Sequence, residues 1–158
     1  MRLSNIKEIS SGESGYDVVI VCTSNENQCK YWQARLEHGK GSVIPTTCKV
    51  IAVHEDWPGG AGNGLGTLYA YQKALAVDSS VAEGLARGEL SVALFHTAGK
   101  GTRLAPLPGG ENNNKPGVKL PCSKNLADGT SPTTILESVI RQTGAYASSR
   151  KGRLSVFW

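Results

Sequence analysis

Four short apolar runs rich in β-branched residues recur along the chain. They occupy residues 17–23, 49–54, 91–96 and 153–158. Each run is apolar almost without interruption, which is typical of strands that are buried on both faces of a parallel sheet. The pattern therefore predicts four such strands.

Helical periodicity fills the intervals between these runs. Residues 25–37 place Cys29, Trp32 and Leu36 at a spacing of three to four, with Ser24 as a candidate N-cap and Gly39 as a stop. Further helices are predicted over residues 67–77, 81–86 and 133–146. Because strand and helix alternate, we expect a Rossmann-like, doubly wound α/β fold with right-handed crossovers and helices on both faces. No domain boundary interrupts residues 1–158, so we expect a single N-terminal nucleotide-binding domain or a fragment of a longer domain.

Composition narrows the class of protein. Apolar residues make up 39% of the chain, and no run approaches the ~18 apolar residues that a membrane span needs. Seventeen basic and 13 acidic residues give a net charge of +4 without a block of like charges, which weakly supports nucleic-acid or membrane binding and fits a small anionic ligand equally well. The polar N-terminus lacks the pattern of a secretory signal, so we expect a cytoplasmic protein with neither nucleic acid nor membrane as a partner.

The cysteines and histidines are scattered. None of Cys22, Cys29, Cys48 and Cys122 forms a C-x-x-C pair, and His38, His54 and His96 show no paired spacing. Reduced thiols and packing histidines are the expectation from these spacings, and the sequence indicates no metal site.

Glycine is in excess, at 19 of 158 residues against an average usage of about 7%, and it gathers in residues 59–66 and 99–117. The third predicted strand runs directly into Ala98, Gly99, Lys100, Gly101, Thr102 and Arg103. Glycines at the carboxyl end of a parallel strand let backbone N–H groups approach a phosphate, and the two bases would neutralise it. An ordinary glycine-rich turn would explain the glycines but not the bases. The spacing matches neither a Walker A loop nor G-x-G-x-x-G, since Leu104 stands where a third glycine is required.

Residues 98–104, followed by Lys115 and by Lys119-Leu120-Pro121, resemble the signature of sugar-phosphate nucleotidyltransferases, also called nucleotide-sugar pyrophosphorylases. The resemblance implies that residues 98–102 bind a nucleoside triphosphate, GTP or UTP, which reacts with a sugar 1-phosphate. It also implies that Arg103 and Lys115 stabilise charge as pyrophosphate leaves. The spacer before Lys115 is longer than is usual in the family, so Lys119 competes with Lys115 for the phosphate contact. The breaker-rich segment 106–129 is expected to be a long functional or mobile loop.

A second glycine-rich segment, residues 57–68, is similar to one found upstream of the signature in fucose-1-phosphate guanylyltransferases, as are residues 23–28. The resemblance adds Gly64, Gly66 and Thr67 as nucleotide-binding residues. A helix that begins near Gly66 and Thr67 would offer its N-terminus to a base edge or a phosphate. A mobile surface loop is the alternative.

The family also uses Mg²⁺, held by an aspartate directly after a later strand that residues 153–158 resemble. No residue of this chain is assigned as that ligand, and Glu55 with Asp56 is the acidic pair nearest the expected crevice. We therefore expect the nucleotide-binding part of a nucleotidyltransferase, inactive by itself and completed by a C-terminal remainder or a second subunit. A non-catalytic nucleotide- or sugar-phosphate-binding module is the alternative.

Overall fold

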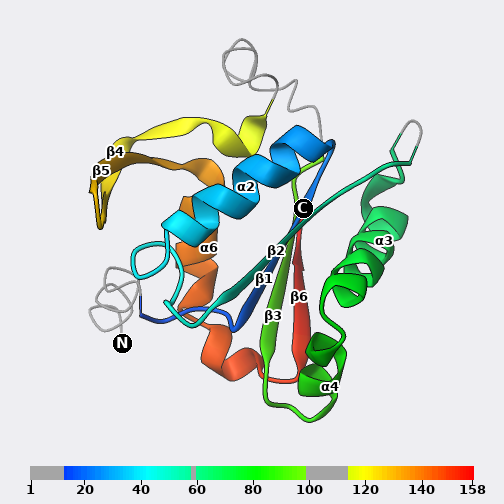
Figure 1. Cartoon of the computed structure of the whole chain (residues 1–158). Helices are drawn as coiled ribbons and strands as arrows, with labels where there is room; N and C mark the ends of the chain where they lie inside the picture. The colour runs from blue at the N-terminus through cyan, green and yellow to red at the C-terminus, as the bar shows by residue number, and fades with distance from the viewer. Residues whose placement is uncertain (1–12, 58–59, 99–113) are drawn as a thin grey trace.

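A four-stranded parallel sheet forms the centre of the computed structural model, which describes residues 13–57, 60–98 and 114–158. Its strands are β1 (Val18–Thr23), β2 (Lys49–His54), β3 (Ser91–His96) and β6 (Arg153–Phe157), in the order β2-β1-β3-β6. All three pairings are parallel, and the strands run toward the top of Figure 1. The four predicted strands are confirmed to within one residue at each end.

Helices cover both faces of this sheet. They are α2 (Glu26–His38), α3 (Gly62–Val77), α4 (Ser80–Ala86) and α6 (Ile135–Gly144). Figure 1 shows α2 and α6 on one side of the sheet and α3 with α4 on the other. Trp32, Leu36 and Ile140 pack with Val19 and Val21 on the first side. Alternate residues of the same strands pack against Ala70, Ala74 and Val81 of α3 and α4 on the second. The α/β class with helices on both faces is thus confirmed.

Local capping explains where two helices begin. The Asn25 side chain accepts a hydrogen bond of 2.9 Å from the Gln28 backbone N–H, so Asn25 is the N-cap of α2 in place of the predicted Ser24. Thr134 and Glu137 form a reciprocal capping box that begins α6 at Ile135, two residues after the predicted start.

The prediction of a long loop over residues 106–129 was wrong for its described part. A short 3-10 helix, η2 (Lys115–Gly117), leads into an antiparallel hairpin of β4 (Lys119–Leu126) and β5 (Gly129–Thr134). Most β4 side chains are exposed, so the strand lacks the apolar alternation by which it could have been recognised. The Asp128-Gly129 pair at its turn, where Gly129 has φ +138°, is the signal that sequence reasoning missed.

The connection between β3 and β6 contradicts the expectation of uniformly right-handed crossovers. β1 reaches β2 by way of α2, whereas β3 reaches β6 in the opposite direction along the sheet by way of α6 on the same face. These two connections therefore have opposite hands, while β2–α3–α4–β3, on the other face, shares the hand of β1–α2–β2. The handedness rule holds because a right-twisted strand that leads into a right-handed helix packs back onto the sheet in one way only. This connection spans residues 97–152, so α6 is placed by other contacts.

A buried ion cluster around Glu137 provides those contacts. Arg35 of α2 approaches both carboxylate oxygens at 2.9 Å, and the Lys124 ammonium of β4 donates to Oε1. The Thr134 N–H donates to Oε2 at 2.8 Å. Burial alone would raise the pKa of Glu137, but the hydrogen bonds from Arg35 and Lys124 lower it below its usual value. A fully buried, ionised carboxylate thus joins α2, α6 and the hairpin.

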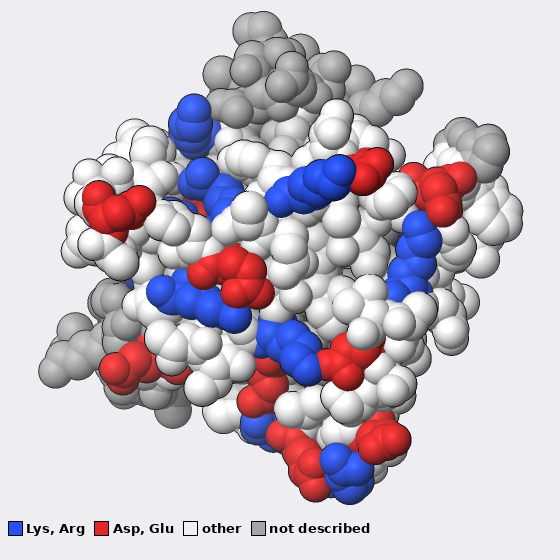
Figure 2. All heavy atoms as spheres, viewed as in Figure 1, with Lys and Arg blue, Asp and Glu red and all other residues white. Residues whose placement is uncertain are grey.

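The surface carries charges of both signs. Figure 2 shows basic and acidic side chains interspersed over the face that includes α2, without a large patch of one sign on that face. Of the helices in the described part of the chain, none combines the length and apolar character needed to cross a membrane.

Replacing Glu137 by glutamine should lower the free energy of unfolding by roughly 3–5 kcal/mol, because Arg35 and Lys124 would lose their buried counter-ion. Denaturation in guanidinium chloride measures the change. Glu37→Gln is the matched control, since Glu37 pairs with Lys40 at the surface, and it should change stability little.

The same variant has a pH signature. The pKa of Glu137 is lower in the folded state than in the unfolded state. Its contribution to the free energy of unfolding is therefore fully present above the unfolded glutamate pKa of about 4.3, and it is lost as pH falls through the lowered folded-state pKa. The stability difference between wild type and Glu137→Gln should therefore shrink in acid. A difference that stayed constant down to acid unfolding would show that the ionised carboxylate contributes nothing.

Candidate functional site

The carboxyl ends of the four strands form one edge of the sheet, near the top of Figure 1. Ligands of open α/β sheets bind in the crevice outside this edge. The residue after β3, Thr97, is anchored there, because its N–H and its hydroxyl both donate to the Cys22 carbonyl at 2.7 Å. The chain that leads into the predicted phosphate loop is thereby fixed against β1.

Part of the predicted phosphate site can be located. Ala98 is half-buried directly after Thr97. Gly99, Lys100, Gly101, Thr102 and Arg103 lie outside the described residues. Lys115 is exposed on η2 and Lys119 is exposed at the first position of β4. The turn that carries Lys115 lies near the same end of the molecule as the strand ends, in yellow in Figure 1. The structure thus leaves the choice between Lys115 and Lys119 undecided.

The second glycine-rich segment differs from its prediction. Helix α3 begins at Gly62, so Gly66 and Thr67 lie in its second turn and not at its N-terminus. Gly66 is buried, and the Thr67 hydroxyl accepts a hydrogen bond of 3.2 Å from Trp158 Nε1. Gly64 is exposed in the first turn. Ala61 stands at the N-cap of α3, and its side chain cannot accept a hydrogen bond. The first backbone N–H groups of α3 therefore have no side-chain cap among the described residues.

Cys22, Glu55 and His96 meet beneath α3. Cys22 and His96 are register partners on β1 and β3, and Glu55 follows β2. One donor atom from each lies within 4.8 Å of the other two, and Glu55 Oε1 is 3.0 Å from His96 Nε2. Cys22 is fully buried, and the side chains of Glu55 and His96 are 7% and 8% exposed. Sequence analysis missed this cluster because its members are far apart in the chain, although each stands near the end of a strand.

Asp56, next to Glu55, is engaged by α3. Its carboxylate accepts a hydrogen bond from the Tyr69 hydroxyl and one of 3.0 Å from Lys73. The Tyr69 and Lys73 hydrogen bonds lower the pKa of Asp56 to about 2. The ring of Trp57 packs edge-on against Tyr69, with centroids 6.2 Å apart.

These partners decide whether the edge suits the Mg²⁺ that the family resemblance implies. Magnesium prefers carboxylate oxygens and water in octahedral geometry. Glu55 is paired with His96 and almost buried, and both oxygens of Asp56 have partners. Among the described residues, the acidic pair at this edge therefore does not fit a magnesium ion.

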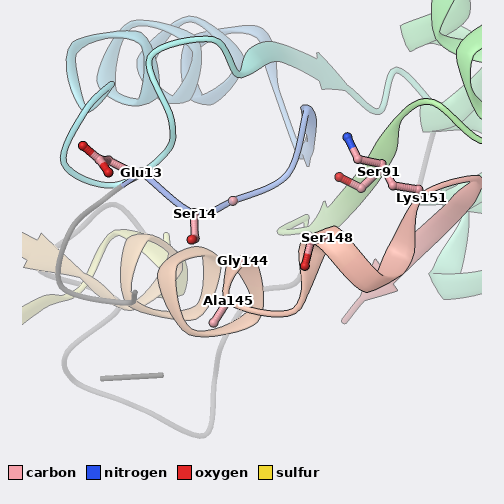
Figure 3. Close-up of a pocket in the computed structure, with 8 residues that line it drawn as sticks. Glu13, Ser14, Ser91, Gly144, Ala145, Ser148 and Lys151 are labelled. Atoms are coloured by element: carbon pink, nitrogen blue, oxygen red, sulfur yellow. The ribbon is translucent and has the colours of Figure 1, made fainter. Parts of the chain in front are cut away.

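A pocket of about 240 Å³ lies at the opposite edge of the sheet, where β3 begins. Figure 3 shows Ser14 from the segment before β1 facing Gly144 and Ala145 at the end of α6, with Ser148 and Lys151 beyond. Lys151 is paired with Asp17 at 2.7 Å. None of the residues predicted from the sequence lines this pocket, so it is separate from the candidate site.

Comparisons with family models, curated proteins and solved structures give no match.

Two glycines of α3 allow a matched test of this geometry. A Cβ at Gly66 would lie 2.7 Å from His96 Nε2 and closer still to Glu55 Oε1, whereas a Cβ at Gly64 would meet nothing within 4 Å. Gly66→Ala should therefore destabilise the chain by roughly 1–3 kcal/mol, because the overpacked pair must move. Gly64→Ala should be neutral or stabilise it by up to about 1 kcal/mol, since alanine favours a helix. Thermal and chemical denaturation measure both, and equal effects of the two substitutions would contradict the close approach.

Proposed function

We propose that the chain binds a nucleoside triphosphate, GTP or UTP, at the carboxyl edge of its sheet. It would do so as the nucleotide-binding part of a nucleotidyltransferase that forms a nucleotide-sugar and pyrophosphate from a sugar 1-phosphate. The observation that carries the proposal is the place of β3. This strand lies inside a parallel sheet and leads straight into the glycine-rich, basic segment 99–103.

Charge at this edge supports binding of a polyphosphate. Lys115 is exposed and forms no ion pair with another described residue, and the family motif contributes Lys100 and Arg103. Basic side chains and free N–H groups at a helix start both favour phosphate oxygens. The first turn of α3 adds backbone N–H groups at Gly62 to Gly64, which no capping side chain among the described residues engages.

Exposed aromatic side chains beside α3 could receive the base. Trp57 is 49% exposed and packs on Tyr69 of α3, and Trp158 is 72% exposed and donates to Thr67 of the same helix. Aromatic faces stack on bases of any sequence. The two tryptophans therefore suit a purine or a pyrimidine equally, in line with the open choice between GTP and UTP.

A non-catalytic nucleotide- or sugar-phosphate-binding module is the second candidate. One observation favours it: in the described residues, both carboxylates of the edge, Glu55 and Asp56, already have protein partners. The phosphate-binding argument applies to both candidates, and the two differ in turnover.

Calorimetric titration should show tighter binding of GTP or UTP than of the corresponding nucleoside. Arg103→Ala should weaken triphosphate binding by about 1.5–3 kcal/mol, the usual scale of a hydrogen bond to a charged group, with little change in Tm.

Lys115→Ala and Lys119→Ala decide between the two lysines, because triphosphate affinity should fall in the variant that loses the phosphate contact and stay unchanged in the other. Arg87→Ala, at the far end of α4, is the control. Equal affinity for nucleoside and triphosphate would refute the phosphate site.

The purified chain should release no measurable pyrophosphate from GTP or UTP in the presence of Mg²⁺ and a panel of sugar 1-phosphates. Charge stabilisation by a metal ion supplies several kcal/mol in such reactions, and the acidic pair at this edge is committed to other groups. A known pyrophosphorylase in the same assay is the positive control. Turnover that Glu55→Gln or Asp56→Asn abolished would place the metal ligands in this chain.

A further inference from the structure

Three potential metal ligands converge beneath α3 without a role in the proposed nucleotide site. Cys22, Glu55 and His96 come from the ends of three neighbouring strands, and their donor atoms lie within 4.8 Å of one another. Ligands 2.0–2.3 Å from one central ion are themselves separated by about 3–4 Å. The observed spacing is thus close to that of a formed site and needs small side-chain movements to reach it.

The absence of a side chain at Gly66 of α3 makes room for the cluster. Gly66 stands over Glu55 and His96, and a Cβ there would collide with both. The cluster is therefore closed by a bare backbone on the side of α3 and by the strands below. In the described part of the chain, Glu55 and His96 keep a small exposure, 7% and 8%, through which a further ligand such as water could approach.

We propose that Cys22, Glu55 and His96 bind a zinc-class divalent ion. A thiolate and an imidazole select zinc or cobalt over magnesium, which takes oxygen ligands. Three protein ligands with one position left for water is a composition found in zinc sites that are open to solvent. This ion is distinct from the Mg²⁺ of nucleotidyl transfer, and the proposal does not rest on nucleotide binding.

The Cys–His–Glu combination also resembles a nucleophile with its base, but the burial of Cys22 opposes that reading. Its side chain has no exposed surface, so no substrate could reach the sulfur. Burial, followed by the nearby Glu55 charge, raises the pKa of the thiol to about 12. On binding, the metal would displace the thiol proton to solvent. The proton shared between Glu55 Oε1 and His96 Nε2 across their 3.0 Å contact would move to His96 Nδ1 or to solvent, so that Oε1 and Nε2 could each bond the ion.

Titration of the chelator-treated chain with Zn²⁺ and with Co²⁺ tests the site. We expect one equivalent to bind, Tm to rise with zinc concentration, and the cobalt form to show visible bands of four-coordinate Co²⁺ with thiolate-to-cobalt charge transfer. Binding without the charge-transfer band, or with no defined stoichiometry, would overturn the proposal.

Matched variants assign the ligands. Cys22→Ala, His96→Gln and Glu55→Gln should each weaken zinc binding by ~100-fold or more, since loss of outer-shell partners alone costs 10–100-fold. Cys48→Ala, Asp56→Asn and Cys122→Ser are the controls for a second buried thiol, the adjacent carboxylate and an exposed thiol. They should retain the affinity and the cobalt spectrum.

Circular dichroism establishes that each variant is folded. Should Cys22→Ala unfold, Glu55→Gln still decides, because glutamine keeps the shape of the side chain and can hydrogen-bond to His96 while it removes the charged ligand. Unchanged zinc affinity in folded Glu55→Gln and His96→Gln would overturn the site.

Discussion

One buried carboxylate determines how the second half of the chain is arranged. Glu137 is fully buried and accepts hydrogen bonds from Arg35, Lys124 and Thr134. These residues belong to α2, β4 and the N-cap of α6, so a single anion fixes three elements together. Partly satisfied charges are costly in the interior, which leaves few alternative placements for α6. The helix is therefore held beside α2, and the β3–β6 connection takes the opposite hand from the other two.

The placement of α6 also positions the candidate site. The Ile135 N–H at the start of α6 donates to the Val118 carbonyl at 3.0 Å, which ties the helix to the residue after η2. Lys115 lies on that short helix, so the ion cluster around Glu137 holds it indirectly at the end of the molecule where the strands finish. The contacts of Glu137 that stabilise the fold thus also help to place Lys115, a candidate for the phosphate contact.

Sequence reasoning succeeded where burial leaves a simple pattern. β1 and β3 are buried along nearly their whole length, and their uninterrupted apolar runs predicted them well. The β4–β5 hairpin was missed because the buried residue of β4, Lys124, is a charge whose burial depends on Glu137. Gly66 was likewise predicted to face a ligand. Its actual neighbours, Glu55 and His96, are distant in the sequence and come together when the parallel strands pair.

The two faces of the sheet thus fix their helices by different means, and this difference bears on the site. On the α2 and α6 face, a buried ion cluster that depends on the charge of Glu137 adds to the apolar packing. On the α3 face, the apolar packing is joined by a close approach at Gly66, which lets the helix backbone rest on the Glu55–His96 pair. The first turn of α3, Gly62 to Gly64, belongs to the same helix, so the close approach at Gly66 helps to set where that turn lies relative to the end of β3.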